Sequence, residues 1–249
     1  MRSNDRGGPL PTLPSIDRYT VPMSFRTTRV ARPRTPWATS RIVFPLVVMG
    51  LVLALAGGAA LWPGLFDAVR YDRGAVASGE AWRLVTAHLV HLNAGHAALN
   101  AAGLAIVAWI FSETLVARRQ AAALAVAATF VDIGLFFVHP EITSYAGLSG
   151  ALHGLFAAGA MAWALDVDGD LPLPDDVARR TRRLWGIVLL LGLFAKLALE
   201  THAHSFWLNG NTMPVVTAAH RWGAAGGLVV ALGYAARAAY LAGGPRNRQ

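Results

Sequence analysis

The chain contains six long blocks of apolar residues, and this feature constrains its fold more than any other. A transmembrane helix needs roughly 20 predominantly apolar residues to cross the hydrocarbon core of a bilayer. The blocks approach that length and lie near residues 42–62, 92–111, 121–138, 148–165, 184–199 and 215–241. Because backbone polar groups inside a bilayer must be satisfied internally, such segments fold as helices that pack on one another. The sequence therefore predicts an all-α membrane protein with six transmembrane helices.

The overall composition agrees with this fold class. Hydrophobic residues make up 55% of the chain and charged residues only 14%, whereas a soluble domain carries about 25% charged residues. The mean hydropathy is +0.43. There is no cysteine, which excludes disulfides, thiolate catalysis and cysteine-based metal sites.

The positive charges indicate topology rather than binding to nucleic acid. The net charge is +8, but the arginines cluster on one side of the predicted membrane, in the stretches 2–41, 118–119, 179–183 and 246–248. The segments 138–148 and 201–217, on the other side, contain no Lys or Arg, and among the loop arginines only Arg70, Arg73 and Arg83 break the pattern. By the positive-inside rule both termini are cytoplasmic.

The same patterns predict the domain organisation. Residues 1–40, rich in Arg, Pro, Ser and Thr, are expected to form a disordered basic cytoplasmic tail. They do not resemble a secretory signal peptide, because the first apolar block starts too late and is long enough to span. Residues 41–242 form the predicted six-helix membrane domain, and residues 243–249 a cytoplasmic C-terminal tail.

Polar side chains inside membrane segments are costly, so each is a candidate functional residue. They are His96, Asn100, Asp132, Ser149, His153, Lys196, Glu200, His220 and Arg221. Four of them, from three different helices, lie near the outer start of their helix and so share one membrane depth: His96, Asn100, Ser149 and His220. Six packed helices could gather them into a single site. A proton channel or transporter would instead carry polar groups across the full depth of the bilayer.

Ser149 and His220 have the types and surroundings of a nucleophile and its general base. A serine hydroxyl becomes nucleophilic when a neighbouring base takes its proton. Ser149 lies between Gly147 and Gly150, which leave its hydroxyl accessible. His220 shares one helical face with Gly223 and Gly227, where a neighbouring helix can approach. The alternative for these glycines is ordinary packing of small residues between membrane helices.

His96 and Asn100 are four residues apart and project from one face of their helix. Both side chains can donate a hydrogen bond, so together they could form an oxyanion hole. The alternatives are a hydrogen-bonded pair between helices and a metal site with His88 and His91. The spacings of these histidines do not place all three on one helical face, so neither a metal nor another cofactor is expected.

In combination these motifs resemble the rhomboid family of intramembrane serine proteases. The resemblance covers residues 42–241 and rests on four motifs in family order: Ala81-Trp82-Arg83, His96-x-x-x-Asn100, Gly147-x-Ser149-Gly150 and His220-x-x-Gly223-x-x-x-Gly227. It implies a rhomboid-like six-helix bundle with a Ser149–His220 dyad and an oxyanion hole of His96 and Asn100. It also implies a location in the bacterial inner membrane, with the active site facing the periplasm.

A finer resemblance is to rhombosortases, a bacterial subgroup of rhomboids. It rests on the segment 145–154 (YAGLSGALHG) and on the Lys196…Glu200 pattern of the fifth helix. It implies that the partners are single-pass membrane proteins, cleaved near a C-terminal Gly-Gly motif that precedes a transmembrane anchor and a basic tail. The rivals are a rhomboid-like protease with a different membrane substrate and a rhomboid-like protein that binds membrane clients without cleaving them.

His153 departs from the rhomboid pattern, because many rhomboids have an aromatic residue four positions after the serine. It lies on the same helical face as Ser149 and competes with His220 for the role of base. We favour His220, with His153 supporting its ring by stacking or through water, since an i, i+4 neighbour is rarely aimed at the hydroxyl. Lys196 and Glu200 should pair and hold the outer end of the fifth helix. Asp132 has no obvious partner and is expected to be structural.

Overall fold

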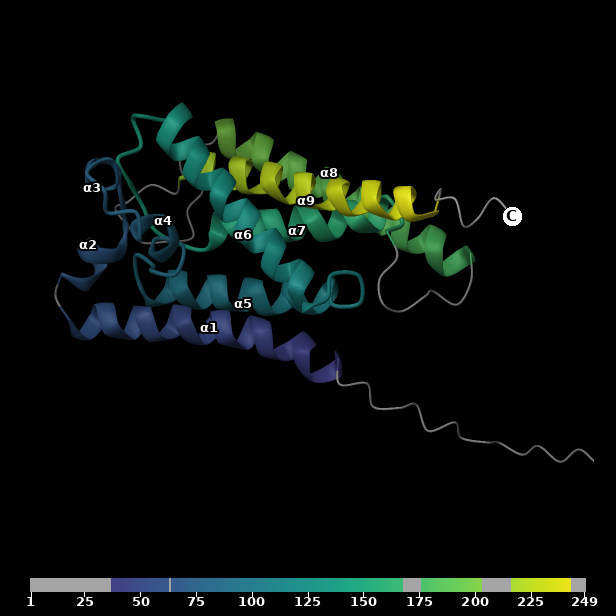
Figure 1. Ribbon diagram of the computed structural model, residues 1–249, viewed down its shortest axis with the longest axis horizontal. Coiled ribbons are helices and arrows are strands. Elements are labelled where there is room, and N and C mark those ends of the chain that lie inside the picture. Colours follow the sequence, from purple (N-terminus) through teal and green to yellow (C-terminus); the bar gives the residue numbers. More distant parts are fainter. Residues whose placement is uncertain (1–36, 63, 168–175, 203–215, 243–249) are drawn as a thin grey trace, which may run out of the picture. The chain divides into compact units, whose positions relative to one another are not determined.

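The computed structural model describes residues 37–62, 64–167, 176–202 and 216–242. Among these residues, six helices have at least 16 residues each: α1 (Trp37–Leu61), α5 (Ala94–Ile110), α6 (Ala117–Ile133), α7 (Ser149–Ala164), α8 (Asp176–His202) and α9 (Thr217–Ala242) (Figure 1). Each overlaps one of the six predicted apolar blocks. Most of the predicted N-terminal tail and the whole predicted C-terminal tail lie outside the described residues.

The structure confirms an all-α membrane protein. Among the described residues, three helical segments are long and apolar enough to cross a membrane: Ala117–Val138, which joins α6 to the π-helical turn η1 (Gly134–Val138), Asp176–Thr201 and Thr217–Leu241. The apolar helices Val43–Ala59 and Ala94–Ile110 are shorter. The number of six spanning helices therefore stays a prediction. Large apolar side chains are exposed along α1, α8 and α9, as expected where lipid rather than water surrounds a helix.

Helix α7 lies at the centre of the packing, against α5, α6, α8 and α9. Its sequence is dominated by Ala and Gly, and most of its residues are buried. Dispersion and polar contacts, rather than water exclusion, hold membrane helices together. Small residues favour these contacts because they let two helix backbones approach closely. The first residue of this central helix is Ser149.

The contact between α7 and α9 is made backbone to backbone. A Cβ atom on Gly223 would overlap the carbonyl oxygen of Gly150, and one on Gly227 would overlap that of Gly154. The glycine face predicted for the sixth apolar block is therefore in contact with the glycines of the fourth. This close packing brings the beginning of α9 beside the beginning of α7.

The first long loop is folded, which the sequence analysis did not foresee. It contains α2 (Leu65–Val69), α3 (Arg73–Ala77) and α4 (Arg83–Thr86). Figure 1 shows them at the end of the bundle where α5, α7 and α9 begin and α8 ends. The loop therefore lies at the end of the bundle that carries Ser149.

Two anchors fix this loop. Strand β1 (Tyr71–Asp72) pairs antiparallel with β2 (Ser144–Tyr145), which lies just before α7. The buried guanidinium of Arg83 donates to the carbonyl oxygens of Asp67 and Arg70 at 2.6 and 2.9 Å. The Trp-Arg motif thus organises a loop that is hydrogen-bonded directly to the segment preceding Ser149.

Candidate active site

Ser149 and His220 lie in hydrogen-bond contact. The Ser149 Oγ atom is 3.0 Å from His220 Nε2, although 71 residues separate them in the chain. Ser149 is the first residue of α7, and His220 lies in the first turn of α9. His220 is only 5% exposed, while Ser149 is half-buried, so a buried imidazole faces a more accessible hydroxyl.

Gly147 shapes the turn that leads into α7. Its φ of +127° lies in the region that favours glycine, and a Cβ there would meet the His96 ring at 2.7 Å. The Gly147 N–H donates to the carbonyl of Ala87 at 2.8 Å, and the Gly147 carbonyl accepts from the Tyr145 hydroxyl at 2.5 Å. Glycine is thus required both by the backbone and by the His96 ring that lies against it.

His91 holds the residue before the serine. The Leu148 N–H donates to His91 Nε2 at 3.3 Å, so the proton of this neutral ring is on Nδ1, which donates to the Leu89 carbonyl at 3.2 Å. His91 is 3% exposed. The sequence analysis considered His91 only as a metal ligand, and the structure instead places it as a support of the turn before Ser149.

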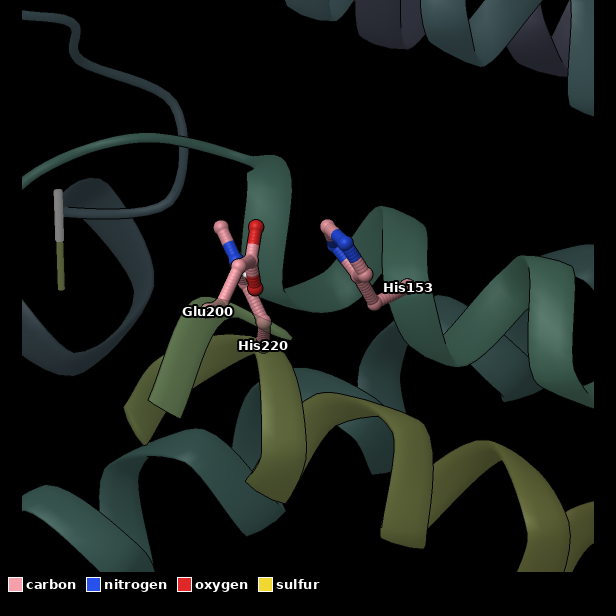
Figure 2. A group of neighbouring side chains, drawn as sticks. All are labelled: His153, Glu200 and His220. Atoms are coloured by element: carbon pink, nitrogen blue, oxygen red, sulfur yellow. Dashed lines mark hydrogen bonds and ion pairs between the residues drawn. The ribbon is translucent and has the colours of Figure 1, made fainter. Parts of the chain in front are cut away.

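Glu200 contacts His220 on the side away from Ser149. His220 Nδ1 lies 2.9 Å from Glu200 Oε2, and Glu200 Oε1 forms an ion pair with Lys196. The predicted Lys196–Glu200 pair is therefore confirmed, but the contact with His220 was not predicted. Figure 2 shows Glu200 and His220 side by side, on α8 and α9. The signal in the sequence that pointed to Glu200 was its charge, which lies one helical turn from that of Lys196 and at the membrane depth predicted for Ser149.

His153 lies beside His220 with both ring nitrogens occupied. The two rings stack with centroids 4.0 Å apart and planes 15° from parallel (Figure 2). His153 Nδ1 is 2.7 Å from the carbonyl oxygen of Ser149, and His153 Nε2 is 2.8 Å from Lys196 Nζ. Neither nitrogen is bonded to the Ser149 hydroxyl, in contrast to His220 Nε2.

The His96 ring lies against the turn before Ser149, and Asn100 follows one helical turn later on α5. The Asn100 side chain is buried, and one of its N–H groups donates to the His96 carbonyl at 2.9 Å. An amide has two N–H groups, and in the part of the chain that the structure describes no hydrogen bond occupies the second. His96 Nδ1 is buried without a partner there. The N–H of Ser149, at the first position of α7, lacks an intrahelical acceptor. The N–H groups of Asn100 and Ser149 are therefore available as donors, and so is His96 Nδ1 in the tautomer that carries its proton there.

Asp132 pairs with a histidine other than His220. Its carboxylate is 3.2 Å from Nε2 of the buried His88, a partner that was not obvious from the sequence and that fits the structural role expected for Asp132. The two residues are 44 positions apart, which is why sequence spacing did not reveal the pair. This contact joins the first loop to the end of α6.

Two of the three histidines considered as a metal site have separate partners: His88 binds Asp132, and His91 binds the Leu148 N–H. A different group has the spacing of a metal site, because ligand atoms of His153, Glu200 and His220 lie within 4.8 Å of one another. The ammonium of Lys196 is bonded to two of these three side chains. A cation of the protein itself therefore lies against this group.

The sequence matches the rhomboid domain over residues 78–237, which is more than half of the chain and includes every residue of this site. The chain belongs to the rhomboid family. Rhomboids are intramembrane serine proteases, so the protein is a multi-pass membrane hydrolase whose substrates are membrane proteins within the bilayer. No curated protein matches the sequence.

This rhomboid has an apolar cavity next to the candidate site. The cavity has a volume of about 490 Å³ and lies between α5, α7 and α8. Its walls are mainly aliphatic and aromatic, with Val107, Phe156 and Leu193 among them, and it reaches His153 and Lys196. An apolar side chain or a lipid tail could occupy this space beside the stacked histidines.

Proposed function

We propose that this rhomboid cleaves its substrates with Ser149 as nucleophile and His220 as general base. The observation that carries the proposal is the 3.0 Å contact between Ser149 Oγ and His220 Nε2. That distance is within the range in which a base takes a proton directly. The glycine contacts between α7 and α9 support it, because they hold the two helix ends together.

The reaction proceeds through an acyl-enzyme. His220 Nε2 takes the proton of the Ser149 hydroxyl as Oγ attacks the carbonyl carbon of the scissile peptide bond. His220 then gives this proton to the leaving amine, and the C–N bond breaks. Water, deprotonated by the same histidine, releases the acyl group and restores Ser149. The substrate must be unwound at this bond, because a regular helix engages its carbonyl groups in internal hydrogen bonds.

We assign the oxyanion hole to His96, Asn100 and the N–H of Ser149. The negative charge of the tetrahedral intermediate needs donors near the carbonyl oxygen. A buried His96 Nδ1 without a partner and an Asn100 with a spare N–H support this assignment, as does the contact of the His96 ring with Gly147. A Cβ on Gly147 would overlap the His96 ring, and one on Gly150 would meet the Ala219 carbonyl of α9 at 3.0 Å, so both glycines allow the close packing around Ser149.

For the substrate we propose single-pass membrane proteins with a C-terminal Gly-Gly anchor, as in rhombosortases. The support is the likeness of residues 145–154 and of the Lys196…Glu200 pattern. The contacts of Lys196 with His153 and Glu200 add to it, because the subgroup residues lie next to Ser149 and His220. We further propose the bacterial inner membrane, with the site facing the periplasm and both termini in the cytoplasm.

The test is cleavage of two membrane-anchored reporters by the full-length protein in cells. One reporter carries the Gly-Gly motif before its anchor, and the other has Leu-Leu at the same place. We expect cleavage of the first only, and none by Ser149→Ala or His220→Ala proteins that accumulate in the membrane normally.

Cleavage of both reporters would contradict the Gly-Gly preference and favour a rhomboid with a different membrane substrate. Cleavage by the Ser149→Ala protein would contradict the assignment of the nucleophile. If the wild-type protein cleaves neither reporter and also leaves a general rhomboid substrate intact, but co-purifies with one of them, the chain is a client-binding protein.

A further inference from the structure

Glu200 is a carboxylate in direct contact with the proposed base, and the mechanism above does not use it. Its Oε2 atom lies 2.9 Å from His220 Nδ1, while Ser149 Oγ lies 3.0 Å from Nε2 of the same ring. The side chains of Glu200 and His220 are 17% and 6% exposed. Serine, imidazole and carboxylate therefore form a continuous hydrogen-bonded series across α7, α9 and α8.

We propose that Glu200 is a positioning residue that orients His220, so that a triad of Ser149, His220 and Glu200 acts, and that Lys196 holds the carboxylate in place. The inference rests on the proposed function, because orienting His220 affects the rate only if His220 is the base. It changes the role expected for Glu200, which the sequence predicted as a structural partner of Lys196.

The first argument concerns the tautomer of His220. A neutral imidazole has one donor and one acceptor nitrogen, and an ionised carboxylate can only accept. Glu200 therefore keeps the proton of the ring on Nδ1 and leaves the Nε2 lone pair facing the hydroxyl of Ser149. When Nε2 takes the serine proton, the carboxylate also stabilises the imidazolium that forms, and Glu200 itself remains ionised.

The second argument concerns Lys196, one turn before Glu200 on α8. Its ammonium pairs with Glu200 Oε1, which leaves Oε2 for His220. The same ammonium lies 2.8 Å from His153 Nε2, and the His153 ring stacks on that of His220. Lys196 thus fixes both the carboxylate behind His220 and the ring beside it. If the Lys196–Glu200 ion pair only stabilised α8, the second carboxylate oxygen of Glu200 would not need to contact His220.

The test compares kcat and KM of the purified full-length protein with those of Glu200→Gln, using a reporter substrate. The amide is nearly isosteric but carries no charge and can present an N–H to Nδ1, which favours the wrong tautomer. We expect kcat to fall by at least about 100-fold with KM within about threefold, because orientation of the base acts on the transition state. Glu200→Asp, which keeps the charge, should recover part of this loss.

Glu141→Gln is the matched control. The Glu141 carboxylate also lies 2.8 Å from the Nδ1 atom of a histidine, His139, but in an exposed loop. The same change of charge there should leave kcat and KM unchanged. Melting temperatures of both variants show whether a loss of activity reflects loss of folded protein.

The outcomes separate this inference from the proposed function, provided that Ser149→Ala and His220→Ala are measured in parallel. If those two are inactive and folded Glu200→Gln keeps kcat within about threefold of wild type, the triad is overturned and the dyad stands. If Ser149→Ala remains active, the proposed function fails. If Glu200→Gln does not accumulate in the membrane, Lys196→Met provides the test. We expect its kcat to be about tenfold lower than that of the wild type. An unchanged kcat would contradict the proposal.

Discussion

The hydrogen bonds around the stacked rings of His153 and His220 place the ring proton on Nδ1 in both. Lys196 donates to His153 Nε2, so His153 Nδ1 carries the proton and donates to the Ser149 carbonyl. In His220 it is Nδ1 that faces the carboxylate of Glu200. Both rings thus keep a lone pair on Nε2, but only that of His220 faces the hydroxyl of Ser149.

Replacement of His153 should therefore affect the rate much less than replacement of His220. His153→Phe keeps a flat ring for stacking, and we expect its kcat to stay within about tenfold of wild type. His220→Phe should lose at least about 100-fold, since a general base contributes about 10²–10⁴-fold. Reporter cleavage by equal amounts of folded protein measures both. The reverse order would make His153 the base.

Removal of the proposed oxyanion donor Asn100 should lower kcat. Asn100→Ala deletes an N–H that could stabilise the tetrahedral intermediate, and such a donor is worth about 10²–10³-fold in kcat. The control is Asn93→Asp on the same helix. The Asn93 side chain caps α5 by accepting the His96 N–H at 2.7 Å, and Asp keeps this acceptor. A wild-type rate for Asn100→Ala would remove Asn100 from the oxyanion hole.

At the scale of elements, the contact between α7 and α9 depends on the absence of a side chain at Gly223. Gly223→Ala places a methyl group against the Gly150 carbonyl, and we expect a loss of about 1–3 kcal/mol of stability together with lower activity. Gly233→Ala on the same helix meets open space and should be neutral or slightly stabilising, because alanine favours helix. Thermal unfolding of the purified proteins measures the difference. Equal stability of both variants would contradict close α7–α9 packing.

The long helices and the proximity of Ser149 to His220 were accessible from the sequence because they depend on local patterns. Apolar blocks determine most of the long helices to within a few residues, although α8 begins at Asp176, well before its predicted block at 184–199. A shared membrane depth brings Ser149 and His220 together. Contacts that depend on packing were not accessible. Glu200 reaches His220 through the relative rotation of α8 and α9, and His91 reaches Leu148 through a loop that is folded by the carbonyl contacts of Arg83. Spacing along the chain does not identify His220 as the partner of Glu200, or Leu148 as the partner of His91.

At the scale of the whole molecule, the distribution of arginine predicts the orientation in the membrane. Because the chain has no cysteine, single introduced cysteines can report it. Ser78→Cys, in the exposed part of the first loop, should react with a membrane-impermeant maleimide in intact spheroplasts. Arg180→Cys, exposed near the start of α8, should react only after the membrane is permeabilised, since the arginines around it are expected to be cytoplasmic. The opposite labelling pattern would invert the topology and place the site on the cytoplasmic side.

The central claim is that Ser149 is a nucleophile activated by His220, and covalent labelling tests it most directly. A fluorophosphonate probe forms a bond only with a serine whose hydroxyl is activated. The wild-type protein in membranes should become labelled, with mass spectrometry locating the adduct at Ser149. The Ser149→Ala and His220→Ala proteins should remain unlabelled at equal abundance. An adduct at another residue, or undiminished labelling of His220→Ala, would contradict the account.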